Sequence, residues 1–182
     1  INIILGCGLY VEQSRPAFLR DYTKNQLTDL FIKEATEGDK NGIVSGFIGE
    51  LGCSKITPGT IECLQIGVEV QKATGLSIMV HPPFFEKEGH QVLDILEKAG
   101  ANMERVVYAH IDPQCDDDEY IDSLIQRGVY VEFDQFLHDF PCTLEQYVRR
   151  WLPSDISRVR SIARQIARGN VKHILLSHDI CF

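Results

Sequence analysis

The chain has 182 residues, of which 18 are lysine or arginine and 26 are aspartate or glutamate, so its formal charge is −8 at pH 7. This charge excludes a protein that binds nucleic acid through a broad basic surface. The 44% hydrophobic and 24% charged residues are typical of a globular domain, and no apolar run approaches the ~20 residues of a membrane span. We therefore expect a single cytoplasmic domain over residues 1–182, with no nucleic-acid or membrane partner.

Six short apolar runs, rich in β-branched residues, predict six strands. They are apolar on both faces, as parallel strands covered by helices are. In chain order the runs are Ile3–Leu5, Ile43–Ile48, Leu76–Val80, Val106–Ala109, Val129–Phe133 and Ile174–Leu176.

Segments with helical spacing lie between these runs. Thr57 and Pro58 predict the N-cap and first residue of a helix that ends at Gly75. Apolar residues at helical spacing predict further helices at Gln26–Glu37, Val92–Ala99, Tyr120–Ile125 and Val159–Ile166. A strand–helix order repeated about six times fits either an open doubly wound sheet or a (β/α) barrel. The long connection from Leu137 to Ser157 is expected to shape a site.

Acidic and histidine residues stand at the ends of the predicted strands. Glu50, His81, His110 and Asp179 each follow a different apolar run, and Asp134 follows another. The carboxyl ends of parallel strands lie on one face, so we expect these side chains to converge. Imidazole nitrogen and carboxylate oxygen together suit zinc and similar divalent ions. Any one of these residues alone is more simply explained as structural, but the set predicts a metal site.

A nucleotide site is the weaker reading of the same sheet. Gly6-Cys7-Gly8 lacks the third glycine and the helix start that a phosphate-binding loop requires.

Four segments resemble the phosphotriesterase family of the amidohydrolase superfamily, above all its phosphotriesterase-related branch. They are Gly46–Ser54, Ile78–Pro82, Tyr108–Asp112 and Leu176–Ile180, and shorter likenesses at Ile4–Val11 and Tyr130–Asp134 extend the resemblance over the whole chain. The resemblance implies a TIM-type (β/α)8 barrel with two divalent metal ions, usually zinc. It also implies that the chain is incomplete, with about strands 3 to 8, because nothing here matches the His-x-His of the family's first strand. We expect this piece alone to be inactive or poorly folded.

The resemblance also implies roles for the strand-end residues. Glu50 corresponds to the bridging carboxylate, and His81 and His110 to ligands of the more exposed ion. Asp179 corresponds to a ligand of the buried ion and handles the proton of the attacking hydroxide. The implied function is a zinc-dependent hydrolase whose metal-bridging hydroxide cleaves an ester, lactone, N-acyl amide or phosphoester bond in a small molecule. The alternative is a catalytically inactive barrel that binds a metabolite or partner, and a homodimer stays open.

Several polar residues near these positions have simpler interpretations. Asp134 orients a ligand or is structural, Asp112 is a weak substrate-pocket candidate, and His178 packs beside Asp179. The arginines of the last predicted helix are expected on a solvated face, with an anion-binding role only if Arg158 turns inward. His90, His138 and His173 are expected to be ordinary helix, loop and surface residues.

The cysteines predict reduced and mostly buried thiols, because they include no CxxC pair. The sequence contains Cys7, Cys53, Cys63, Cys115, Cys142 and Cys181. Cys53 and Cys181 lie near the expected site, but their spacing is not that of a zinc ligand set, so small buried residues are the better interpretation.

Overall fold

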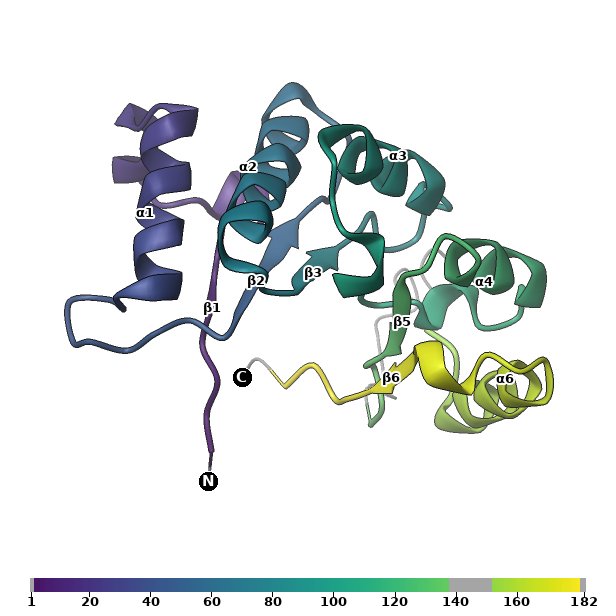
Figure 1. Ribbon diagram of the computed structural model, residues 1–182. Helices are drawn as coiled ribbons and strands as arrows, with labels where there is room; N and C mark the ends of the chain where they lie inside the picture. The colour runs from purple at the N-terminus through teal and green to yellow at the C-terminus, as the bar shows by residue number, and fades with distance from the viewer. Residues whose placement is uncertain (1, 138–151, 181–182) are drawn as a thin grey trace.

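The computed structural model describes residues 2–137 and 152–180. Within these residues, six parallel strands form one sheet and follow one another in sequence order (Figure 1). Each of the described strands pairs only with its neighbours in the chain, as a strand–helix repeat requires. The strands are β1 (Gly6–Cys7), β2 (Phe47–Gly52), β3 (Ile78–His81), β4 (Val106–Tyr108), β5 (Tyr130–Phe133) and β6 (Ile174–Leu176).

The helices form an outer layer around the curved sheet (Figure 1). They are α1 (Lys24–Thr36), α2 (Pro58–Thr74), α3 (Gly89–Ala99), α4 (Asp118–Ile125) and α6 (Asp155–Ala167), with short 3₁₀ turns at Glu12–Ser14, Ala17–Asp21, Met103–Arg105, Asp112–Gln114 and Val171–His173. A doubly wound sheet would carry helices on both faces. The single outer layer therefore confirms the incomplete (β/α)8 barrel.

Helix α2 shows how local sequence sets these elements. Thr57 Oγ1 accepts a hydrogen bond from the Thr60 backbone N–H at 3.1 Å, and Gly75 ends the helix at φ 73°. These are the predicted start and end. Between them, Leu64 and Val68 are fully buried between the sheet and the neighbouring helices, and each contributes roughly 1.5–3 kcal/mol of burial free energy.

The first predicted strand is displaced. The apolar run Ile3–Leu5 is not a strand, and Ile3 and Ile4 are 79% and 72% exposed. Strand β1 starts at Gly6, where the backbone first pairs with Phe47 of β2. Hydropathy identifies an apolar run, but a strand also needs a hydrogen-bonded partner in register. The partner of β1 is β2, which begins at Phe47 rather than at Ile43, the start of its apolar run.

The inner face of α6 is polar, which contradicts the predicted apolar stripe. Val159 and Ile166 are 56% and 48% exposed, whereas Arg158, Ser161 and Gln165 are fully buried. Arg158 and Gln165 point inward because Asp112, in the 3₁₀ turn before α4, and Asp118 of α4 offer them charged partners, which an apolar pattern does not reveal.

The expectation of buried, reduced thiols holds for the cysteines that the structure describes. Cys7, Cys53, Cys63 and Cys115 are buried free thiols, whereas Cys142 and Cys181 lie outside the described residues. None of the described helices is long and apolar enough to span a bilayer.

Candidate metal centre

The ends of three neighbouring strands bring Glu50, His81 and His110 together. One possible ligand atom from each lies within 4.8 Å of the other two, and among the residues that the structure covers this is the group that fits a metal ion. His81 Nδ1 is 2.7 Å from His110 Nε2. Glu50 Oε1 lies 3.2 Å from His110 Nε2, and Glu50 Oε2 lies 3.7 Å from His81 Nδ1. The two carboxylate oxygens therefore face different imidazoles.

An irregularity in β2 presents Glu50 to this centre. The register between β2 and β3 shifts between Ile48 and Leu51, and the Gly49–Glu50 peptide bond is cis. Gly49 has φ 137°, and a Cβ on it would lie 2.4 Å from the Met79 backbone oxygen, so only glycine fits. Register shifts of this kind redirect side chains next to functional sites. Because β2 continues to Gly52, Glu50 lies within the strand rather than just after it, where the apolar run had predicted it.

Asp134 fixes the orientation of His110. Asp134 Oδ1 accepts a hydrogen bond from His110 Nδ1 at 2.9 Å, and Asp134 Oδ2 accepts one from the His110 backbone N–H, also at 2.9 Å. Both side chains are only 3% exposed. The His110 backbone lies in the left-handed region at φ 54°, a conformation that residues other than glycine adopt infrequently. A proton on Nδ1 leaves the lone pair of Nε2 directed at Glu50, which is the usual arrangement of a metal-binding histidine.

His81 ends β3 and is contacted by an aromatic side chain that the sequence reasoning missed. The Tyr10 hydroxyl lies 3.4 Å from His81 Nδ1, and the two rings are edge to face with centroids 5.1 Å apart. Tyr10 follows β1, so its place beyond a strand end was the available indication of a role here.

The electrostatics of the centre favour a cation. Burial works to raise the pKa of Glu50, but hydrogen bonds from His110 and His81 lower it to about 2. Burial works to lower the pKa of His110, but Asp134 and Glu50 raise it to about 10. The carboxylates of Asp134 and Glu50 thus stabilise positive charge at the His110 imidazole. A divalent cation next to His110 Nε2 would supply that charge, and a donor set of two imidazole nitrogens and a carboxylate suits zinc.

Asp179 is linked to the centre through Gln135, a residue that the sequence reasoning did not single out. Gln135 Nε2 donates to Asp179 Oδ2 at 2.8 Å and lies 3.3 Å from Asp134 Oδ1. Asp179 is half-buried, has φ 43° and is not part of the three-residue group. Gln135 comes directly after Asp134 at the end of β5, and this adjacency was the only indication in the sequence.

Asp112 and Arg158 form a buried ion pair behind the centre. Arg158 Nε lies 2.8 Å from Asp112 Oδ1, and both side chains are 0% exposed. Asp112 also accepts hydrogen bonds from the backbone N–H groups of Asp134 at 3.0 Å and Gln135 at 3.3 Å. Asp112 is therefore not a substrate-pocket residue, and Arg158 does not lie on a solvated face. The pair instead holds the chain that carries the two residues supporting His110 and Asp179.

The remaining candidates have lesser parts. His178 is exposed and contacts the Phe136 ring rather than packing in the core. Cys53 is fully buried and lies outside the three-residue group. His90 lies on α3, and His173 is half-buried with Nδ1 3.0 Å from the Val129 carbonyl oxygen. Cys181, His138 and most of the connection from 137 to 157 fall outside the described residues.

Known proteins with similar sequences and structures are about twice as long as this chain. An N-acetyltaurine hydrolase from Dictyostelium discoideum is 33% identical over 99% of the chain and 49% of its own length. A resiniferatoxin-binding protein from Rhodobacter sphaeroides superposes with a TM-score of 0.90 at 34% identity, over 97% of this chain and 49% of its own. A phosphotriesterase homology protein from Escherichia coli, solved with phosphate in its active site, gives 0.84 at 26% identity, over 99% and 59%.

These matches show how much of its relatives' length the chain covers and to which family it belongs. The chain spans about half the length of the curated relatives that it matches. The model of the phosphotriesterase family matches residues 1–182, the full extent of the chain. The fold, the strand-end residues and this match agree, and the protein belongs to the phosphotriesterase family.

Proposed function

We propose that this chain supplies one wall of the active site of a zinc-dependent hydrolase that acts on a small molecule. The observation that carries the proposal is the approach of Glu50, His81 and His110 to within 4.8 Å, on neighbouring strands of a phosphotriesterase-family barrel. Glu50, His81, His110 and Asp179 would hold the metal ions, and zinc bound there would supply Lewis acidity toward the scissile carbonyl or phosphoryl group and a more acidic water.

The side chains divide the work of binding. Glu50, whose two oxygens lie near the two imidazoles, is the proposed carboxylate that both ions would share. His81 and His110 would together hold the more exposed ion. Asp134 keeps the Nδ1 proton of His110 in place, so that Nε2 stays available as a ligand.

Asp179 is the proposed proton acceptor as well as a ligand of the second ion. Gln135 holds Asp179 Oδ2 by its amide N–H at 2.8 Å, which fixes the plane of the carboxylate. The proton of the attacking water passes to Oδ1, and the same carboxylic acid then protonates the leaving group.

An N-acyl amide is the substrate class that the relatives favour. Several of them, at 30–33% identity, are named N-acetyltaurine hydrolase. N-acetyltaurine and N-acetyl amino acids are therefore the first substrates to test, followed by lactones, esters and phosphotriesters.

Metal content and turnover of the full-length protein test the proposal. We expect about two zinc ions per chain by elemental analysis, and hydrolysis that stops on chelation and returns with zinc. Glu50→Gln should lower both zinc content and kcat, whereas Glu97→Gln, on the outer surface of α3, should change neither. Wild-type zinc content in the Glu50 variant would remove it from the metal centre.

The role of Asp179 is tested separately. Asp179→Asn should retain at least one zinc ion but lose most of kcat, because the amide cannot accept the proton. Full activity in this variant would exclude Asp179 as the base.

A binding protein without catalysis is the second candidate. It is favoured by one observation, the 34% identity to a protein named for binding resiniferatoxin. If the zinc-loaded protein binds the screened compounds with measurable affinity and consumes none of them, the binding protein is the better assignment.

A further inference from the structure

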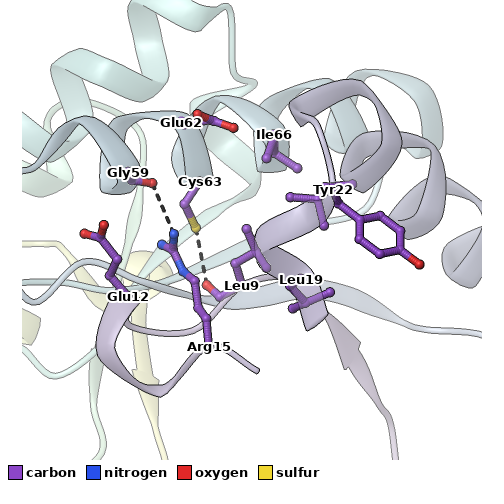
Figure 2. A pocket seen from close by; sticks show the side chains of 10 residues that line it. Leu9, Glu12, Arg15, Leu19, Tyr22, Gly59, Glu62, Cys63 and Ile66 are labelled. Carbon is purple, nitrogen blue, oxygen red and sulfur yellow. Dashed lines mark hydrogen bonds between the residues drawn. The ribbon is translucent and has the colours of Figure 1, made fainter. Parts of the chain in front are cut away.

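A second cavity lies between α2, α1 and the segment after β1, apart from the metal centre (Figure 2). It encloses about 330 Å³, which is the size of sites that hold small metabolites. None of the three residues of the metal centre lines it. Its walls are Leu9, Glu12, Arg15, Leu19, Tyr22, Leu27, Gly59, Glu62, Cys63 and Ile66.

Arg15 is the central polar residue of this cavity. Its Nε donates to the Tyr10 carbonyl oxygen at 3.0 Å, and its Nη1 donates to the Gly59 carbonyl oxygen at 3.5 Å. Its Nη2 is buried and has no hydrogen-bond partner among residues 2–137 and 152–180. A buried guanidinium nitrogen without an acceptor costs free energy, and an oxygen of a bound ligand would satisfy it.

One carboxylate shares this end of the cavity with Arg15. Figure 2 shows Glu12 beside the first turn of α2, on the same side of the helix as Arg15, whereas the carboxylate of Glu62, another lining residue, lies on the opposite side of α2. Glu12 Oε2 accepts a hydrogen bond from the Thr57 hydroxyl at 2.8 Å, and this neutral donor leaves the carboxylate its negative charge. This end of the lining thus carries one positive and one negative group, so it offers sites for both signs of charge.

The opposite end of the cavity is apolar. Leu9, Leu19 and Ile66 lie on the other side of Arg15 from Glu12 in Figure 2, and Leu27 of α1 closes this end. Leu9 and Leu27 are only 5% exposed. An aliphatic group placed here would remove further apolar surface from water.

We propose that this cavity binds an α-amino acid with an aliphatic side chain. The ligand carboxylate pairs with Arg15 Nη2, the ammonium group lies against Glu12, and the side chain contacts Leu9, Leu19 and Ile66. A simple carboxylic acid would satisfy Arg15 but bring its charge close to the Glu12 carboxylate. A simple amine would leave Nη2 without an acceptor. Only a ligand with both charges and an apolar body matches all three parts of the lining.

Calorimetry on the full-length protein tests this proposal without measuring turnover, so its outcome is independent of the hydrolase assignment. The probe is L-leucine, and the comparison compounds each lack one feature: 4-methylpentanoate the ammonium group, isopentylamine the carboxylate and glycine the side chain. We expect one L-leucine per chain with a Kd of about 1 mM or tighter, and at least tenfold weaker binding of each comparison compound. The result should be the same after zinc is removed by chelation.

Two variants place the binding in this cavity. Arg15→Gln should weaken L-leucine binding at least tenfold, whereas Arg160→Gln, at an exposed position on α6, should leave it unchanged. Leu19→Trp fills the apolar end while keeping the charges of Arg15 and Glu12, so it should also block binding if Arg15→Gln does not fold. The proposal is overturned if L-leucine does not bind, as when another segment of the full-length chain fills the cavity. It is also overturned if 4-methylpentanoate binds more tightly than L-leucine, or if a folded Arg15→Gln or Leu19→Trp variant binds L-leucine like wild type.

Discussion

Removal of Arg158 should destabilise the fold more than removal of any exposed arginine on the same helix. Arg158→Met keeps the length and apolar body of the side chain but leaves the Asp112 carboxylate buried without its cation. Both side chains are 0% exposed, so water cannot replace the lost partner. Breaking a buried ion pair on one side costs about 3–5 kcal/mol. For a domain of this size, such a loss lowers Tm by roughly 6–20 °C.

Arg168→Met is the matched control. Arg168 lies on the same helix and pairs with Asp122 at 2.6 Å and Glu119 at 2.8 Å, but its side chain is 36% exposed. Exposed pairs contribute less than about 1 kcal/mol. The difference between the two variants therefore isolates the effect of burial.

The double variant Arg158→Met with Asp112→Asn tests the cause. The amide oxygen can still accept the backbone hydrogen bonds, and no ionised group stays buried. We expect this variant to be at least about 1 kcal/mol more stable than Arg158→Met alone. Urea unfolding of the full-length protein, followed by circular dichroism, measures all three. An Arg158→Met variant within about 1 kcal/mol of Arg168→Met would refute the reasoning.

Two further predictions concern single positions in the fold. Burial raises the pKa of the Cys53 thiol to about 12, so about 10⁻⁴ of it is thiolate at pH 8, against about a quarter of a free thiol. Iodoacetamide labelling with peptide mapping should therefore modify Cys53 at least a hundredfold more slowly in the native protein than in urea, and equal rates would show that Cys53 is accessible. Gly49→Ala should destabilise the fold by more than about 3 kcal/mol, because its Cβ meets a backbone oxygen at 2.4 Å. Gly75→Ala, where a Cβ meets nothing within 4 Å, should lose only about 1–2 kcal/mol in the same urea assay, and equal losses would contradict the steric argument.

The sequence predicted the fold well because residues next to each helix determine where the helix begins and ends. The cap at Thr57 begins a helix and the left-handed glycines at Gly75 and Gly100 end helices, for reasons that act within a few residues. The order of the strands then follows from the repeat. The start of β1 was wrong because strand pairing depends on a partner 41 residues away, as in the register of Gly6 with Phe47.

The sequence predicted where the candidate site lies, but not the hydrogen bonds and ion pairs that support its residues. Positions at strand ends identified Glu50, His81 and His110, which lie together, although their roles as ligands stay predictions. The default assignment of Arg158 to a solvated face was wrong, because an apolar-periodicity argument places charged residues in water. A buried partner such as Asp112 reverses that assignment, and it comes from a part of the chain 46 residues away.

The left-handed backbone of His110 carries torsional strain of order 1 kcal/mol, which a glycine would relieve. Glycine would also remove the imidazole and leave the buried Asp134 carboxylate without its Nδ1 donor, and that loss outweighs the strain relieved. Directed evolution for heat tolerance alone should therefore retain this histidine and gather its stabilising changes elsewhere, even when turnover is not selected.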